Sequence, residues 1–148
     1  MIKQSDIMAA INQLIVTAFP DHTVYIQKCP EDFDRPSFLL EYIKISQRDV
    51  SMASVEKTVH FTITCFAESG NHDGPEMDRL ADLQDNVLGL FQGYLAVKDR
   101  ALNVKSIGGG IDANRAYIEI QFGFFDDRTD TKEQIPLVTS VHTNIKEE

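Results

Sequence analysis

Apolar side chains recur at steps of three and four along residues 75–98, the longest periodic run in the chain. This spacing places them on one face of an α-helix. Pro75 suits the first helical position, and Glu76 and Asp78 complement the positive end of the helix dipole. The sequence therefore predicts one long amphipathic helix over residues 75–98. Its apolar stripe is formed by Met77, Leu80, Leu83, Val87, Leu90, Phe91, Tyr94 and Leu95.

A second, shorter amphipathic helix is predicted near the N-terminus. Ser5 or Asp6 can cap its start, and Pro20 ends it. The run that follows, residues 23–28, is β-branched and aromatic, which is typical of a strand. The apolar stripe of this first helix is formed by Ile7, Ala10, Ile11, Leu14, Ile15 and Ala18.

Two longer strands are predicted in the middle of the chain. Along residues 37–48 the apolar alternation changes phase at Ile43, which indicates a bulge or a strand buried on both faces over part of its length. Residues 55–68 alternate more cleanly, although Lys57 falls among the apolar positions. Because the connection between these strands is short, we expect an antiparallel hairpin with its tip at residues 49–54.

Residues 102–107 and 116–125 have the pattern of two further strands, and Gly108, Gly109 and Gly110 interrupt the run between them. The predicted order is helix, three strands, helix, two strands. This order predicts an α+β fold, a mostly antiparallel sheet of about five strands with two helices packed on it.

Beyond Asp127 the chain becomes charged and turn-prone and then modestly apolar. We therefore expect a single domain over residues 1–127. Residues 128–148 are expected to form a C-terminal arm or a flexible tail.

The 148 residues carry a formal net charge of −9, which argues against a surface that grasps nucleic acid. Cys29 and Cys65 have no metal-ligand spacing, so we expect two reduced thiols in a cytoplasmic protein. The N-terminus has no signal-peptide pattern, and no apolar run has the roughly 20 residues that span a bilayer. These features predict a soluble protein without a membrane segment.

The residues that could carry chemistry form no catalytic pattern. His72, Asp73, Glu76 and Asp78 are close in sequence, but acids at a helix start are explained by the helix dipole. His60 and Cys65 have odd spacing on one strand, so they face opposite sides of the sheet. The three glycines lack a phosphate-binding motif. The acids Glu31, Asp32 and Asp34 are expected in a solvated loop. We predict no catalytic residue, no bound metal and no cofactor.

Three stretches carry a resemblance to a known family: SDIMAAINQLIVTAFPDHTVYIQ, PSFLLEYI, and YIEIQFGFF followed by an acidic turn. Together with the order of the elements, they make residues 5–127 similar to the tail terminator proteins of long-tailed bacteriophages. More narrowly, the chain resembles the small terminators found in prophages and phage-tail-like particles of Gram-positive bacteria.

The resemblance implies a non-enzymatic virion protein of the head–tail junction, assembled in the host cytoplasm. It implies a ring of identical subunits, a hexamer, that binds the tail tube protein, stops tube growth and offers a docking surface to the head–tail connector protein. DNA would pass through the channel without specific binding. The expected contact residues lie at the hairpin tip and at the last turn: Arg48, Asp49, Val50, Ser51, Met52, Ser54, Gly108, Gly109, Gly110, Asp112 and Asn114.

Two other functions remain open from the sequence. One is a soluble interaction or adaptor protein that works as a monomer or dimer. The other is a small metal-dependent hydrolase that would use His72 with nearby carboxylates. The lack of a clustered nucleophile, base and orienting group weighs against the hydrolase.

Overall fold

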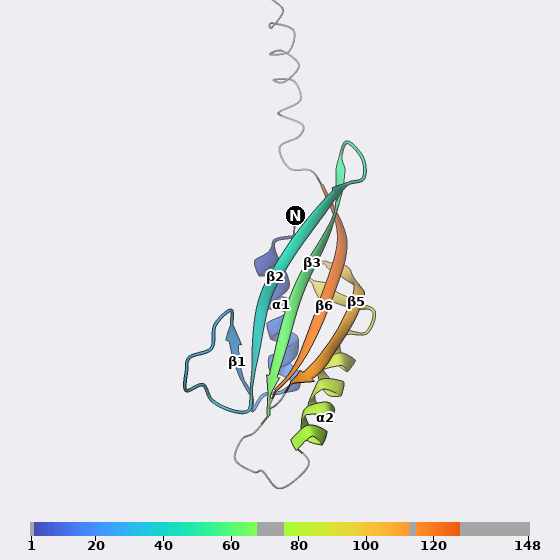
Figure 1. The fold of residues 1–148 in the computed structure, drawn as a ribbon. Helices are drawn as coiled ribbons and strands as arrows, with labels where there is room; N and C mark the ends of the chain where they lie inside the picture. Colours follow the sequence, from blue (N-terminus) through green and yellow to red (C-terminus); the bar gives the residue numbers. More distant parts are fainter. Residues whose placement is uncertain (1, 68–75, 113–114, 128–148) are drawn as a thin grey trace, which may run out of the picture.

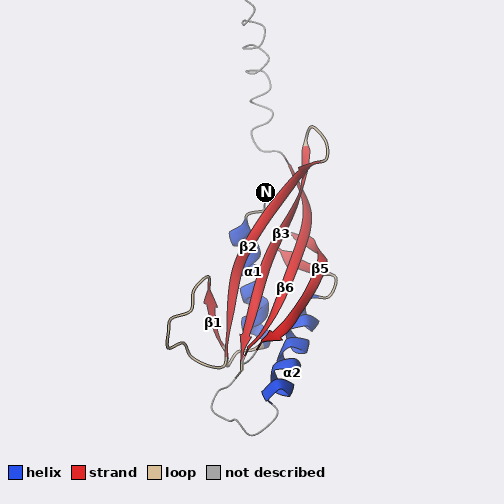
Figure 2. Ribbon diagram, in the orientation of Figure 1, coloured by secondary structure: helices blue, strands red, loops and turns tan. Residues whose placement is uncertain are grey.

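The computed structural model describes residues 2–67, 76–112 and 115–127, with the backbone alone at positions 76 and 77. Two α-helices, a short 3-10 turn and six strands make up this part of the chain (Figures 1 and 2). The mixed α+β class predicted from the sequence is confirmed. In chain order the elements are α1 (Gln4–Ala18), β1 (Thr23–Ile26), β2 (Ser37–Asp49), β3 (Ser54–Phe66), α2 (Glu76–Leu88), η1 (Gly89–Phe91), β4 (Tyr94–Val97), β5 (Arg100–Asp112) and β6 (Arg115–Asp127).

The six strands form one sheet in the order β1-β2-β3-β6-β5-β4. β1 pairs with β2 in parallel, whereas every other neighbouring pair is antiparallel. The sheet curls, so that strands at its two opposite edges, β1 and β4, both contact α1. Figure 1 shows α1 behind the central strands. A mostly antiparallel sheet was predicted correctly, but it has six strands rather than about five.

The extra strand comes from the region predicted as one long helix, and that prediction is wrong in its second half. The α-helix ends at Leu88, the 3-10 turn η1 follows, and Tyr94–Val97 form the edge strand β4. Gly93 has a φ of +92°, a conformation that glycine adopts readily and that reverses the chain here. Along β4, Leu95 and Val97 are buried while Tyr94 and Ala96 are exposed, which is the period of a strand. A four-residue apolar run fits the period of a helix and that of a strand equally well. Its pairing with β5 therefore determines that it forms a strand.

The long hairpin of β2 and β3 is confirmed, with its turn between Asp49 and Ser54. Its register shifts between Tyr42 and Lys44, which is the bulge that the change of phase at Ile43 predicted. Beyond this bulge β2 is exposed, and Figure 1 shows the hairpin projecting past the start of α1. The distal part of the hairpin therefore extends beyond the core of the domain.

The second hairpin, of β5 and β6, is longer than predicted. Gly108, Gly109 and Gly110 pair in continuous register with β6 and do not interrupt the strand. The irregularity lies earlier, between Val104 and Ser106. Glycine is tolerated here because this half of β5 is an outer edge of the sheet, and at Gly109 and Gly110 close neighbours leave little room for a side chain.

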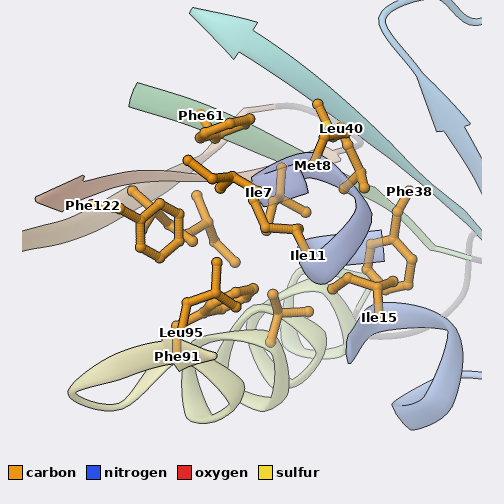
Figure 3. Packing of buried hydrophobic residues seen from close by; sticks show 14 of the residues in the cluster. Ile7, Met8, Ile11, Ile15, Phe38, Leu40, Phe61, Phe91, Leu95 and Phe122 are labelled. Atoms are coloured by element: carbon orange, nitrogen blue, oxygen red, sulfur yellow. The ribbon is translucent and has the colours of Figure 1, made fainter. Parts of the chain in front are cut away.

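The core lies on one face of the sheet, where both helices pack. In Figure 3, Ile7 and Ile11 of α1 point toward Phe61 and Phe122 of the central strands, with Phe91 of η1 beside them. The start of α1 differs from the prediction. Lys3 is the N-cap residue, and its backbone N–H donates a hydrogen bond of 2.9 Å to the carboxylate of Asp6, which lies within the first turn. Ser5 is likewise inside the helix.

Phe91 and Leu83 give a test of this core. Phe91 is almost fully buried, whereas Leu83 is only partly buried against the core cluster. We expect Phe91→Ala to lower the free energy of unfolding by about 3–5 kcal/mol and Leu83→Ala to lower it by clearly less. Urea unfolding followed by circular dichroism measures both. Equal losses would mean that Leu83 is buried as deeply as Phe91, and that α2 therefore packs on the sheet through a different face.

Candidate assembly surface

The two regions predicted to contact partners lie at opposite ends of the sheet. We call residues 48–54 the hairpin tip and residues 108–114 the β5–β6 turn. β3 and β6 pair over their whole length, from Ser54 opposite Asp127 to Phe66 opposite Arg115. At roughly 3.3 Å per residue these two pairs are about 40 Å apart. The predicted contact residues therefore form two separate surfaces.

The hairpin tip is a short turn that exposes apolar side chains. The backbone N–H groups of Val50 and Ser51 donate hydrogen bonds of 3.1 and 3.2 Å to the carbonyl of Ser54, which closes the turn. Met52 is 76% exposed and Val50 is 50% exposed. An apolar pair held out on a projecting hairpin is typical of a contact site for another protein.

Charged side chains brace the base of the tip on the face of the sheet that the helices leave open. Glu56 pairs with Arg48 of β2 and, at 3.5 Å, with Lys105 of β5. The hydrogen bond from Arg48 outweighs partial desolvation and, with Lys105, holds the pKa of Glu56 below its ordinary value. Lys105 also lies over Gly123, where a Cβ would collide with its side chain. Three strands are thus joined just below the tip.

A buried charged cluster lies on the opposite face at the same end, and the sequence did not identify it. The carboxylate of Asp126 lies 3.4 Å from Lys57 and 3.5 Å from Arg100, and it accepts a 3.4 Å hydrogen bond from the backbone N–H of Ile2. Burial raises the pKa of Asp126, but the hydrogen bonds from Lys57 and from the backbone N–H groups of Asp127 and Ile2 outweigh it and lower the pKa overall. The signal in the sequence was Lys57 itself, a charge at a core-facing position.

At the β5–β6 turn, Gln84 of α2 binds the helix to the sheet through its side-chain amide. Its Nε2 donates hydrogen bonds of 3.0 and 2.9 Å to the carbonyls of Gly110 and Tyr117. A Cβ on Gly109 would collide with the Tyr117 carbonyl and reach Gln84. Gly109 is thus required for packing, whereas Asp112 is exposed. Asn114 lies outside the described residues.

A stack of aromatic and arginine side chains at the same end was also missed. The Arg115 guanidinium lies 5.0 Å from the ring centroid of Phe66, and that of Arg35 lies 5.4 Å from the same ring and 5.1 Å from Phe33. Arg35 also donates to the carbonyl of Ala67 at 3.3 Å. These residues come from three segments, 33–35, 66–67 and 115, that are far apart in sequence and have no shared periodicity. They fix the loop before β2 onto the end of β3.

The candidate catalytic groups do not converge in the described part of the chain. Cys65 is buried in the core, where desolvation raises its pKa to about 12, and His60 lies on the other face of β3. Burial and the nearby Lys44 lower the pKa of His60. His72 and Asp73 lie outside the described residues, and within them no cluster of three metal-ligating side chains occurs. The acids Glu31, Asp32 and Asp34 are exposed, as predicted for a solvated loop.

Neither helix in residues 2–67 and 76–112 has the length and apolar character needed to cross a membrane.

Asp126→Asn tests the buried charged cluster. Because the folded pKa of Asp126 is lowered, its contribution to stability is fully present above about pH 4 and is lost as the pH falls through the folded value. We expect the variant to lose about 1–3 kcal/mol at pH 7 and to converge with the unmodified protein as the pH falls below the folded pKa of Asp126. Urea unfolding across pH measures this. Asp127→Asn is the matched control, since that side chain is exposed. A loss independent of pH would contradict the assignment.

Gly109→Ala tests the docking of α2 on the β5–β6 turn. The added methyl group would collide with the Tyr117 carbonyl and displace Gln84, so we expect a loss of about 1–3 kcal/mol in thermal or urea unfolding. Gly108→Ala is the matched control, because a Cβ at Gly108 meets no atom within 4 Å. Similar losses at both positions would show that glycine is needed there for backbone conformation alone.

Comparison with known proteins identifies the family. Residues 6–134 match the family model described as phage tail terminator protein. A search of curated proteins gives no match. One solved structure aligns with 86% of this chain and 97% of its own chain at 17% identity, but its TM-score of 0.41 is too low to carry an argument. Since the family model covers most of the sequence, the resemblance seen in the sequence is confirmed. The chain belongs to a family of phage tail terminator proteins, and its role is that of a structural component of phage tail assembly.

Proposed function

We propose that this protein forms a ring, a hexamer, on the last ring of tail tube protein, stops growth of the tube and offers the surface to which the head or its connector protein docks. The observation that carries this proposal is the pair of separate surfaces at the two ends of the sheet. A terminator needs two different axial contacts, one below and one above. The hairpin tip and the β5–β6 turn are about 40 Å apart along the strands.

We assign the hairpin tip to the tail tube and the β5–β6 turn to the connector. Stopping tube growth requires a lasting contact, and the exposed Met52 and Val50 provide apolar area for one. The braced base of the hairpin holds that area in a fixed position. At the other end Asp112 is an exposed charge at the end of β5, which suits a polar contact made later in assembly.

The net charge supports a role beside passing DNA. At −9 the protein repels the phosphate backbone, so DNA can move through a ring of such subunits without sticking. We further propose that residues 1–127 are the ring-forming domain and that residues 128–148 are an arm that crosses to a neighbouring subunit. The prophage or Gram-positive origin stays a prediction.

Met52→Asp tests the assignment of the hairpin tip. A charge in an apolar contact should weaken capping, so tails assembled with this variant should become longer and more variable in length, while the unfolding free energy changes by less than about 0.5 kcal/mol. Negative-stain imaging measures tail length. Asp112→Lys is the matched variant at the other end. It should leave tail length unchanged and reduce the fraction of tails that join heads.

The opposite pattern, with Asp112→Lys altering tail length and Met52→Asp blocking head attachment, would reverse the orientation. If neither variant changes tail length or head attachment although both fold, the assembly surfaces lie elsewhere. A protein that binds neither tubes nor connectors would contradict the proposed function itself.

A further inference from the structure

β2 has an outer edge that β1 leaves unpaired from Ile43 to Arg48, and we call these residues the free half of β2. β1 covers that edge only from Ser37 to Leu40. At the end of β1, Gln27 takes a φ of +70°, donates its backbone N–H to the Leu40 carbonyl and accepts the Tyr42 N–H on its side chain at 2.6 Å. In the described part of the chain no strand pairs with this edge beyond Tyr42. The apolar residues of this free half are Ile43, 55% exposed, and Ile45, 42% exposed.

β4 is the free edge on the opposite side of the sheet. It ends the strand order, and its exposed residue Tyr94 is 58% accessible. Beside it lies an apolar groove between β4 and the outer side of α1, with a volume of about 480 Å³. Polar residues Asp6, Gln13, Thr17 and Lys98 line part of the groove, and small or aliphatic side chains line the rest. The latter include Ala9, Ala10 and Leu14 of α1 and Ala96 of β4.

The two free edges lie at the same level of the sheet. One rung of paired residues crosses all five strands between them: Ser46, Thr58, Gly123, Asn103 and Tyr94. Four antiparallel pairings separate β2 from β4, so both strands run toward the hairpin tip. A copy placed beside another in the same orientation would therefore bring β2 and β4 together in parallel, without a shift along the strands.

We propose that the free half of β2 in one copy pairs with β4 of the next, with Ser46 beside Tyr94. Ile43 and Ile45 lie on the side of this rung away from the hairpin tip, and they pack at the end of the apolar groove nearest Leu14. This contact deepens the proposed ring and rests on it. Two different surfaces that meet make a head-to-tail interface, which closes into a ring when no axial rise accumulates. Because the free half of β2 and the strand β4 lie at the same level along the strands, their pairing adds no axial rise. Both free edges belong to this chain and are complementary, which identifies the occupant of each as a second copy.

A cysteine pair tests the contact. In a Cys29→Ser background, Ser46→Cys and Tyr94→Cys place thiols on exposed positions of the two edges that share one rung in the proposed pairing, and the remaining Cys65 is buried. After mild oxidation, the double variant should give a covalent ladder on non-reducing gels that ends at the ring size. Each single variant should remain monomeric on the gel. The experiment is done with protein in solution at high concentration and with protein bound to tail tubes.

A second pair serves as the control. Ser46→Cys with Asp112→Cys uses an exposed position at the other end of the β5 edge, and it should give no ladder. Equal cross-linking of both pairs, or none in either pair on tubes that are capped normally, would overturn the proposed contact while leaving the tail function intact. A ladder from protein that does not cap tubes would support the contact and contradict the proposed function.

Discussion

Burial of one face of the sheet by α1 and α2 is the interaction on which the rest of the structure depends. Residues such as Phe61 of β3 and Phe122 of β6 meet Ile11 of α1 in a single apolar layer. The opposite face carries polar residues such as Thr58, and none of the described helices lies over it. The core takes most of the large apolar side chains of the described residues. Among those that stay exposed, Val50 and Met52 lie at the hairpin tip, and Ile43, Ile45 and Tyr94 lie on the edge strands, where they suit contacts with other proteins.

The charged cluster at Asp126 allows the long hairpin to extend beyond this core. At that end of the core, the ion pairs of Asp126 with Lys57 and Arg100 lie between the apolar layer and the solvent. The same carboxylate holds the backbone of Ile2, so the chain's first residues, β3, β5 and β6 are joined at one point. On the other face Glu56 joins β2, β3 and β5. The hairpin tip is thus carried on a base fixed from both sides.

The ends and the edges of the sheet suit different contacts of an assembly protein. The hairpin tip and the β5–β6 turn face opposite ways along the strands, which suits neighbours above and below. The free half of β2 and the edge strand β4 face sideways at one level, which suits identical neighbours. A member of the tail terminator family must engage other tail components, and its described surface offers these separate sites without any convergence of catalytic groups.

The sequence by itself determined the faces of the elements, because a side chain's face depends only on local periodicity. It predicted α1, the β2–β3 hairpin, the bulge at Ile43 and the burial of Cys65 opposite His60. Only the tertiary structure decided which strands pair and which side chains contact each other. Tyr94–Val97 became a strand through pairing with β5, and Lys57 found Asp126, which lies 69 residues away. Pairing across the sheet also decided that the predicted contact regions lie at opposite ends, since local pattern carries no information about which segments meet.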